Sequence, residues 1–163
     1  MITNMLLDSW DRQCQILESV ASLVTEENRH FRPAASSWTI DRQLAHVHNT
    51  RTYFLSQVAP DLSAELKEIA DEDEVTLDQI LAALSASGTA IRSAVSAGLE
   101  AGGPLSGGYV VYDNPILLLQ HMIWHEGWHT GLICLALRLN GQEPPEEWEE
   151  PNVWGKWRTE NWE

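Results

Sequence analysis

Three histidines recur at four-residue intervals in the last long apolar stretch of the sequence. His121, His125 and His129 each lie about 40° around a helix from the one before, because successive residues advance by about 100°. They form one stripe, and Leu118 and Leu132 fall on the same side by the same count, so the stripe is expected to face the interior. Imidazoles at positions i and i+4 leave one helical face about a turn apart and can bind one metal ion together.

Two imidazoles hold a divalent cation weakly, so a third ligand is expected from another part of the chain. The remaining histidines are His30, His46 and His48, and the last two fall within one predicted helix. The apolar periodicity of that helix alone favours His48, which lies nearer its apolar centre than His46 does. The alternative is a set of core histidines, but each unsatisfied buried polar group costs about 1–3 kcal/mol, which favours a shared ion.

Glu126 directly follows His125, and residues 125–129 read H-E-x-x-H, the zinc-peptidase motif in which the glutamate is a general base. Glu126 is therefore the catalytic acid/base candidate, although its position about 100° from His125 also suits a solvated charge or a salt-bridge partner. A peptidase is the weaker interpretation, because no histidine follows the motif and no strand is predicted. Asn49 and Tyr53 either line the site or pack between helices.

Four stretches with helical periodicity must position these side chains. Thr76 and Gln79 predict a capping box, Gly98 a helix end, and Asn114 a cap before the proline that starts the last helix. Residues 109–112 are too short and isolated to build a sheet. The sequence therefore predicts an all-α bundle of four helices, with these expected ranges: 4–25, 39–58, 76–98 and 115–141.

Two segments resemble signatures of the DinB/YfiT-like family of metalloenzymes, whose relatives include bacterial thiol S-transferases and a mycothiol-dependent maleylpyruvate isomerase. Residues 38–46 (WTIDRQLAH) resemble the start of the family's second helix, where the final histidine binds metal. Residues 125–131 (HEGWHTG) resemble its fourth-helix signature, where two histidines complete the triad. The resemblance extends to about Gly141. It implies an up-down-down-up bundle and one zinc or nickel ion on His46, His125 and His129. His48, which the apolar periodicity favours, is the fallback for His46.

The same resemblance implies a divalent-metal-dependent enzyme, either a hydrolase or a thiol S-transferase, that acts on a small molecule. Coordination positions left open by three histidines are available to water or substrate, and a cation there activates a water or a thiol. A non-catalytic metal-binding or stress-related bundle is the alternative. His121 either supports the metal ligands or is a core histidine. A homodimer is expected because family members often pair through helix faces.

Length and composition suit one domain over residues 1–163, since 163 residues with 44% hydrophobic content can fill a single core. Ten basic residues against 24 acidic ones give a formal charge of -14, which opposes binding to nucleic acid and to anionic membranes.

Cys14 and Cys134 lie in apolar helical patterns and suit reduced core residues, which favours the cytoplasm. The N-terminal stretch has no basic leader, and Asp8 interrupts its apolar run, so neither a secretory signal nor a membrane span is expected.

The C-terminal segment, residues 142–163, combines four tryptophans with glutamates and prolines. Disordered tails are poor in aromatic residues, so this extension is expected to pack against the bundle or against a second subunit.

Overall fold

The computed structural model describes residues 2–70 and 74–159 and is almost entirely helical, which confirms the predicted all-α class. Its long helices are α1 (Ile2–Ala21), α2 (Ile40–Val58), α4 (Leu77–Ala101) and α5 (Pro115–Leu139). Its short elements are α3 (Pro60–Ser63), the strands β1 (Leu105–Ser106) and β2 (Val111–Tyr112), α6 (Glu146–Asn152) and the 3-10 helix η1 (Trp154–Lys156).

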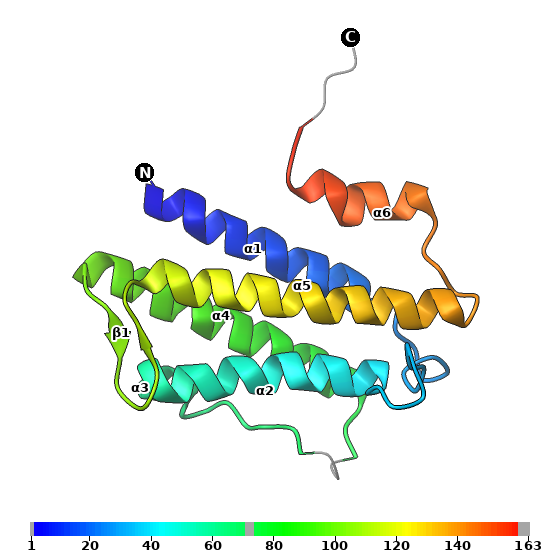
Figure 1. Cartoon of the computed structure of the whole chain (residues 1–163), viewed down its shortest axis with the longest axis horizontal. Helices are drawn as coiled ribbons and strands as arrows, with labels where there is room; N and C mark the ends of the chain where they lie inside the picture. Colours follow the sequence, from blue (N-terminus) through cyan, green and yellow to red (C-terminus); the bar gives the residue numbers. More distant parts are fainter. Residues whose placement is uncertain (1, 71–73, 160–163) are drawn as a thin grey trace.

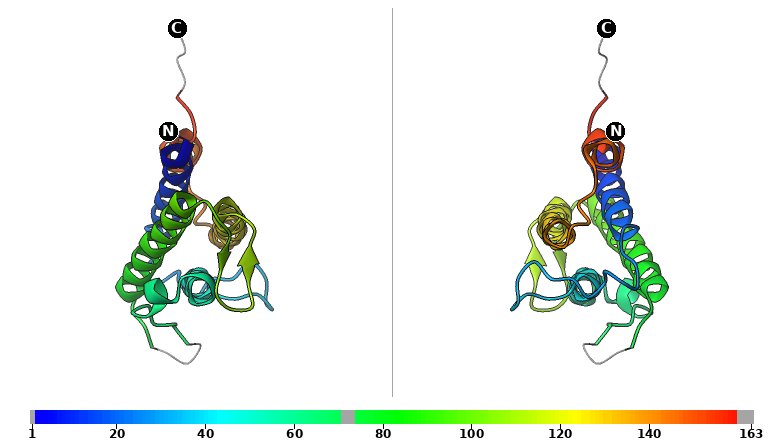
Figure 2. Two further views of the ribbon diagram at one scale, coloured as in Figure 1. Left: turned by 90° about the vertical axis from the view of Figure 1, so that its left-hand side faces the viewer. Right: turned by 90° about the vertical axis from the view of Figure 1, so that its right-hand side faces the viewer.

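The four long helices lie along one another, with α1 and α5 running in one direction and α2 and α4 in the other (Figure 1). Because α2 and α4 follow one another among the long helices and run parallel, the connection between them, which contains α3, has to return along the length of the bundle. End-on views show the four helices around a common interior, with α6 outside them and beside α1 (Figure 2).

The interior holds two apolar clusters, one at each end of the bundle, and both take side chains from all four long helices. Leu44, Ile80 and Ile133 belong to the first cluster, and Leu55 and Ile91 to the second. All five side chains are at most 1% exposed, and burying each one contributes about 1.5–3 kcal/mol relative to leaving it in water. The two clusters fix α2 and α5 against each other at both ends, and the histidines lie between these ends.

Most helix boundaries agree with the sequence. The predicted capping box is present, since Gln79 N donates to Thr76 Oγ1 at 3.2 Å and Thr76 N donates to Gln79 Oε1 at 2.8 Å. Helix α1 ends at Ala21 instead of residue 25. The reason is local, because Thr25 N donates to Asn28 Oδ1 at 2.8 Å and so enters a turn rather than the helix.

Two predictions about the region after residue 98 were wrong. Helix α4 passes through Gly98 and ends before Gly102, whose φ of 68° is the left-handed conformation that glycine adopts readily. A Cβ on Gly98 would lie 2.7 Å from Leu105 and from Pro115, so this glycine permits close packing. Residues 111–112 also pair with residues 105–106 in a two-stranded antiparallel hairpin, although the sequence indicated no sheet.

Helix α4 is long and apolar enough, by length and composition, to cross a membrane, and 44% of its most apolar window is buried within the protein. Its buried apolar side chains belong to both apolar clusters and pack among the other three long helices. This is the environment of a core helix.

The C-terminal segment contacts α1 and the adjoining end of the core. Trp148 and Val153 pack against the first apolar cluster, and Arg12 Nη1 of α1 donates to the carbonyl oxygen of Lys156. Residues 160–163, including Trp162, lie outside the described residues.

Candidate metal centre

Three histidine side chains from two antiparallel helices meet between the ends of the bundle. His46 comes from α2, and His125 and His129 come from α5. One ring nitrogen from each lies within 4.8 Å of the other two. The structure therefore brings His125 and His129, which their spacing singled out, together with His46, which the family resemblance favoured over His48.

The spacing of these nitrogens fits ligands of one cation. His46 Nε2 lies 3.1 Å from His125 Nε2. Two nitrogens bound to tetrahedral zinc at about 2.0–2.1 Å lie roughly 3.3 Å apart. The ring centroid of His129 is 4.8 Å from that of His46 and 4.6 Å from that of His125, so the third imidazole completes a compact group.

Gln43 orients His129. Its Oε1 accepts a hydrogen bond from Nδ1 of His129, because an amide oxygen cannot donate. The proton on Nδ1 leaves the lone pair on Nε2, which is the tautomer that a metal ligand needs. Nδ1 of His125 is buried and has no hydrogen-bond partner among the described residues.

The environment keeps these imidazoles neutral. Burial, with smaller contributions from the neighbouring His129 and His46, lowers the pKa of His125 to about 3. Burial and His46 lower the pKa of His129 to about 4, and burial also lowers the pKa of His46. Neutral imidazole nitrogens in a group that disfavours protons have lone pairs for a cation.

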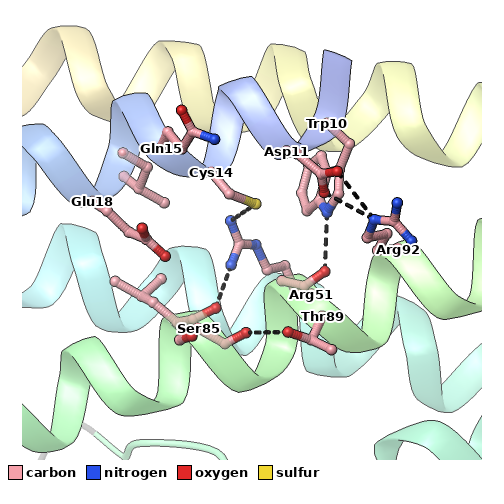
Figure 3. Close-up of a pocket in the computed structure, with 12 residues that line it drawn as sticks. Trp10, Asp11, Cys14, Gln15, Glu18, Arg51, Ser85, Thr89 and Arg92 are labelled. Carbon is pink, nitrogen blue, oxygen red and sulfur yellow. Dashed lines mark hydrogen bonds and ion pairs between the residues drawn. The ribbon is translucent and has the colours of Figure 1, made fainter. Parts of the chain in front are cut away.

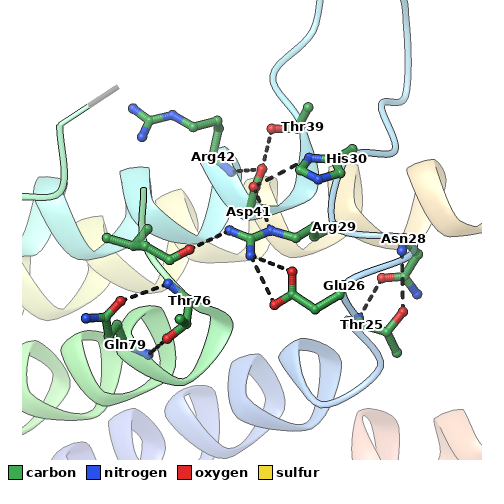
Figure 4. Close-up of polar contacts among 11 residues, drawn as sticks. Thr25, Glu26, Asn28, Arg29, His30, Thr39, Asp41, Arg42, Thr76 and Gln79 are labelled. Carbon is green, nitrogen blue, oxygen red and sulfur yellow. Dashed lines mark hydrogen bonds and ion pairs between the residues drawn. The ribbon is translucent and has the colours of Figure 1, made fainter. Parts of the chain in front are cut away.

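The start of α2 is held in place by an ion-pair network that Figure 4 shows. Arg29 Nε lies 3.0 Å from Asp41 Oδ2, and Arg29 Nη1 lies 2.9 Å from Glu26 Oε2. Arg29 Nη2 also donates to the carbonyl oxygen of Val75 at 2.8 Å, which ties in the segment before α4. This network fixes the segment that carries Trp38, whose ring centroid lies 4.6 Å from that of His46.

Two cavities flank the histidine group. The first, of about 440 Å³, is lined by His46, Asn49, Thr50, Tyr53, Phe54 and Glu68. The second, of about 250 Å³, is lined by Trp38, Gln43, Trp128, His129 and their neighbours. The hydroxyl of Thr50 lies 3.3 Å from His46 Nε2, and Trp38, Tyr53 and Trp128 are about half exposed. The group is thus reached from outside between aromatic side chains.

The remaining histidines lie elsewhere. His48 is 1% exposed, and its ring nitrogens lie 2.9 Å from the carbonyl oxygen of Ala83 and 2.8 Å from that of Lys67, so it is not free to join the group. Nδ1 of His121 lies 2.8 Å from the hydroxyl of Tyr112.

Glu126 lies inside the bundle and forms an ion pair. Its Oε1 lies 2.7 Å from Nε of Arg51, and both side chains are at most 2% exposed. Arg51 Nη1 also donates to the carbonyl oxygen of Leu84 at 2.7 Å. Figure 3 shows the guanidinium between Trp10 and Cys14 of α1, and burial raises the pKa of the Cys14 thiol to about 12. The salt-bridge alternative for Glu126 fits this arrangement, and a solvated charge does not.

Three residues of these sites were missed in the sequence. Gln43 precedes His46 by three residues and Thr50 follows it by four, so helical spacing alone places both near its face. Arg51 gave no local signal, because its partner Glu126 is 75 residues away in the chain. Asn49 was expected either to line the site or to pack, and it does both, since its Nδ2 donates to the carbonyl oxygen of Ile69 at 2.8 Å.

These features define an all-α protein with a partly buried three-histidine group suited to one cation. The chain belongs to the DinB family, whose sequence model matches residues 1–152. This match confirms the resemblance inferred from the two segments. Comparison with curated proteins and comparison with solved structures each returned no significant match.

Proposed function

We propose that this DinB-family protein binds one divalent cation, zinc or nickel, through His46, His125 and His129, and that it is a metal-dependent enzyme for a small molecule. The observation that carries the proposal is the convergence of the three neutral imidazoles, with His46 Nε2 and His125 Nε2 only 3.1 Å apart. The directions of the four long helices support the up-down-down-up order that the family resemblance implies.

The surrounding residues suit an open site rather than a closed structural one. A cation held by three histidines supplies Lewis acidity, which lowers the pKa of a water or thiol that reaches it. Gln43 holds His129 in the ligand tautomer, and Thr50 places a hydroxyl beside His46. Trp38 and Tyr53 offer apolar walls on either side of the group, which favours a small substrate with an apolar part.

The candidate chemistry is hydrolysis or thiol transfer to an electrophile, as the family resemblance implies. A peptidase that uses Glu126 as its general base is disfavoured by the geometry, because that carboxylate is fully buried and paired with Arg51. A non-catalytic metal-binding bundle remains the second candidate, and turnover distinguishes it from an enzyme.

Metal content by mass spectrometry on untagged protein tests the binding proposal. Wild-type protein is expected to hold close to one zinc or nickel per chain after reconstitution, and His46→Ala and His125→Ala should lose it. His121→Ala is the matched control, because this histidine lies one turn from His125 on the same helix and pairs with Tyr112 instead. Metal retained in both ligand variants, or absent from the wild type, would refute the site.

Activity is tested on the same proteins. The reconstituted wild type is screened for ester hydrolysis and for consumption of a thiol by a small electrophile, with and without a chelator. Turnover that needs metal and is lost in His46→Ala supports an enzyme. Stoichiometric metal without turnover in either screen supports the non-catalytic alternative.

A further inference from the structure

A third cavity lies on the face of α5 that points away from the histidine group. It has a volume of about 380 Å³ and lies between α1, α5 and the C-terminal segment. Thr130, Gly131 and Cys134 line it from α5, and at about 100° per residue they lie roughly 140–240° around the helix from His125. The cavity is therefore distinct from the candidate metal centre.

Glycines open this side of α5. A Cβ on Gly127 or Gly131 would meet no heavy atom within 4 Å, so packing within the described chain does not require glycine at either position. Glycine inside a helix costs about 0.5–1 kcal/mol relative to alanine. The two residues keep space along α5 that any larger side chain would fill.

The floor of the cavity carries a polar side chain without a protein partner. Gln13 of α1 is 5% exposed, lines the cavity, and makes no hydrogen bond to any residue within the ranges 2–70 and 74–159. The hydroxyl of Thr130, on the opposite wall, is buried and also lacks a partner in this part of the chain. The Gln13 amide is not sealed from solvent, unlike the Thr130 hydroxyl, so it is open to the cavity and can hydrogen-bond to a ligand there.

The remaining walls are apolar and aromatic. Trp148, Trp154 and Trp157 cover the cavity from the C-terminal segment, and Ile16 and Val20 line it from α1. The charged groups that line it have partners in the protein. Arg138 forms an ion pair with Glu143, and Glu149 accepts a hydrogen bond from Trp154 Nε1.

We propose that this cavity binds a small, neutral, planar molecule whose polar group hydrogen-bonds to the side-chain amide of Gln13. The volume falls within the usual range of small-molecule pockets, about 300–1,000 Å³. Indole rings favour a flat apolar ligand by stacking. A neutral ligand is preferred to an anion because the chain carries a net charge of -14 and no unpaired cation lines the described walls.

Benzamide is the probe, because it is flat and neutral and its carboxamide complements that of Gln13. The indole N–H signals of ¹⁵N-labelled protein are followed by NMR during titration, with a dissociation constant on the order of 1 mM expected for so small a ligand. Signals of Trp148, Trp154 and Trp157 should shift. The signals of Trp124 and Trp128, which do not line the cavity, should not shift.

Two variants locate the site. Gly131→Leu fills the cavity while raising helix propensity, so the variant should fold. Its affinity for benzamide should fall at least about tenfold. Ala86→Leu, at an exposed position of α4, is the matched control and should bind as the wild type does. Gln13→Leu should lower the affinity for benzamide about fivefold, which is the equivalent of one neutral hydrogen bond. Its affinity for toluene should not change.

Each outcome decides the proposal. It is overturned if benzamide shifts none of the three indole signals, or if it shifts them equally in Gly131→Leu. If Gln13→Leu lowers the affinities for benzamide and toluene equally, the assigned role of the amide is overturned. Circular dichroism on every variant shows whether the helices are intact.

Discussion

Replacing Glu126 with glutamine tests whether this glutamate is structural or catalytic. Arg51 would keep its charge in the core, where it is 1% exposed, but would lose the carboxylate that lies 2.7 Å from its Nε. Removing one partner of a buried ion pair costs about 3–5 kcal/mol, because the other charge is left without compensation. We expect Glu126→Gln to lower the free energy of unfolding by that amount in urea denaturation, with an unchanged m-value.

A double variant isolates the pairing. Arg51→Met with Glu126→Leu replaces both charges by apolar side chains of similar size, and such replacements are often neutral or stabilising. We expect it to recover most of the lost stability and to bind metal as the wild type does. A loss below about 1 kcal/mol in Glu126→Gln, or additive losses in the double variant, would refute the structural role. A stable, metal-loaded but inactive double variant would instead favour catalysis by Glu126.

Two further predictions concern the histidine group. Gln43→Leu removes the acceptor for His129 Nδ1 and should weaken metal affinity about 10–100-fold in a competition assay with a chromophoric chelator; unchanged affinity would contradict the orienting role. In metal-free protein, His125 and His129 have pKa values of about 3 and about 4, below the ordinary 6.5, so the folded state binds protons more weakly than the unfolded state. Thermal stability should therefore fall as pH falls from about 6.5 toward 4, and His125→Phe should show a shallower decline; equal slopes in both proteins would argue against this linkage.

Local patterns in the sequence predicted the helices well, because each signal acts within a few residues. The Thr76–Gln79 capping box and the positive φ of 74° at Gly141 both depend on neighbours in the chain. Gly98 was misjudged because its role depends on Leu105 and Pro115, which approach it only in the folded protein. A glycine that ends a helix and one that admits a neighbouring segment cannot be told apart by position alone.

The histidines show the same division between local and distant information. The interval of four residues was enough to place His125 and His129 on one face, but apolar periodicity favoured His48 on α2. That histidine is indeed the more buried of the pair, yet its ring nitrogens face the carbonyl oxygens of Ala83 and Lys67. Periodicity measures depth in the core, whereas a metal ligand needs a nitrogen that no other group occupies. Choosing His46 over His48 therefore required the family resemblance. The contacts of His48 explain why this residue is not the ligand.

Helix α5 shows why one sequence pattern can hide several roles. The four-residue interval predicted one stripe of histidines on this helix but no role for its other faces. In the structure His125 and His129 face α2, Glu126 faces the core, and Gly131 borders the cavity beneath the C-terminal tryptophans. Each face is polar or small where it meets a specific partner, so the histidine stripe accounts for only one of the roles of this helix. A mutation on one face should therefore act on one site, which is why Gly131→Leu is expected to leave metal content unchanged.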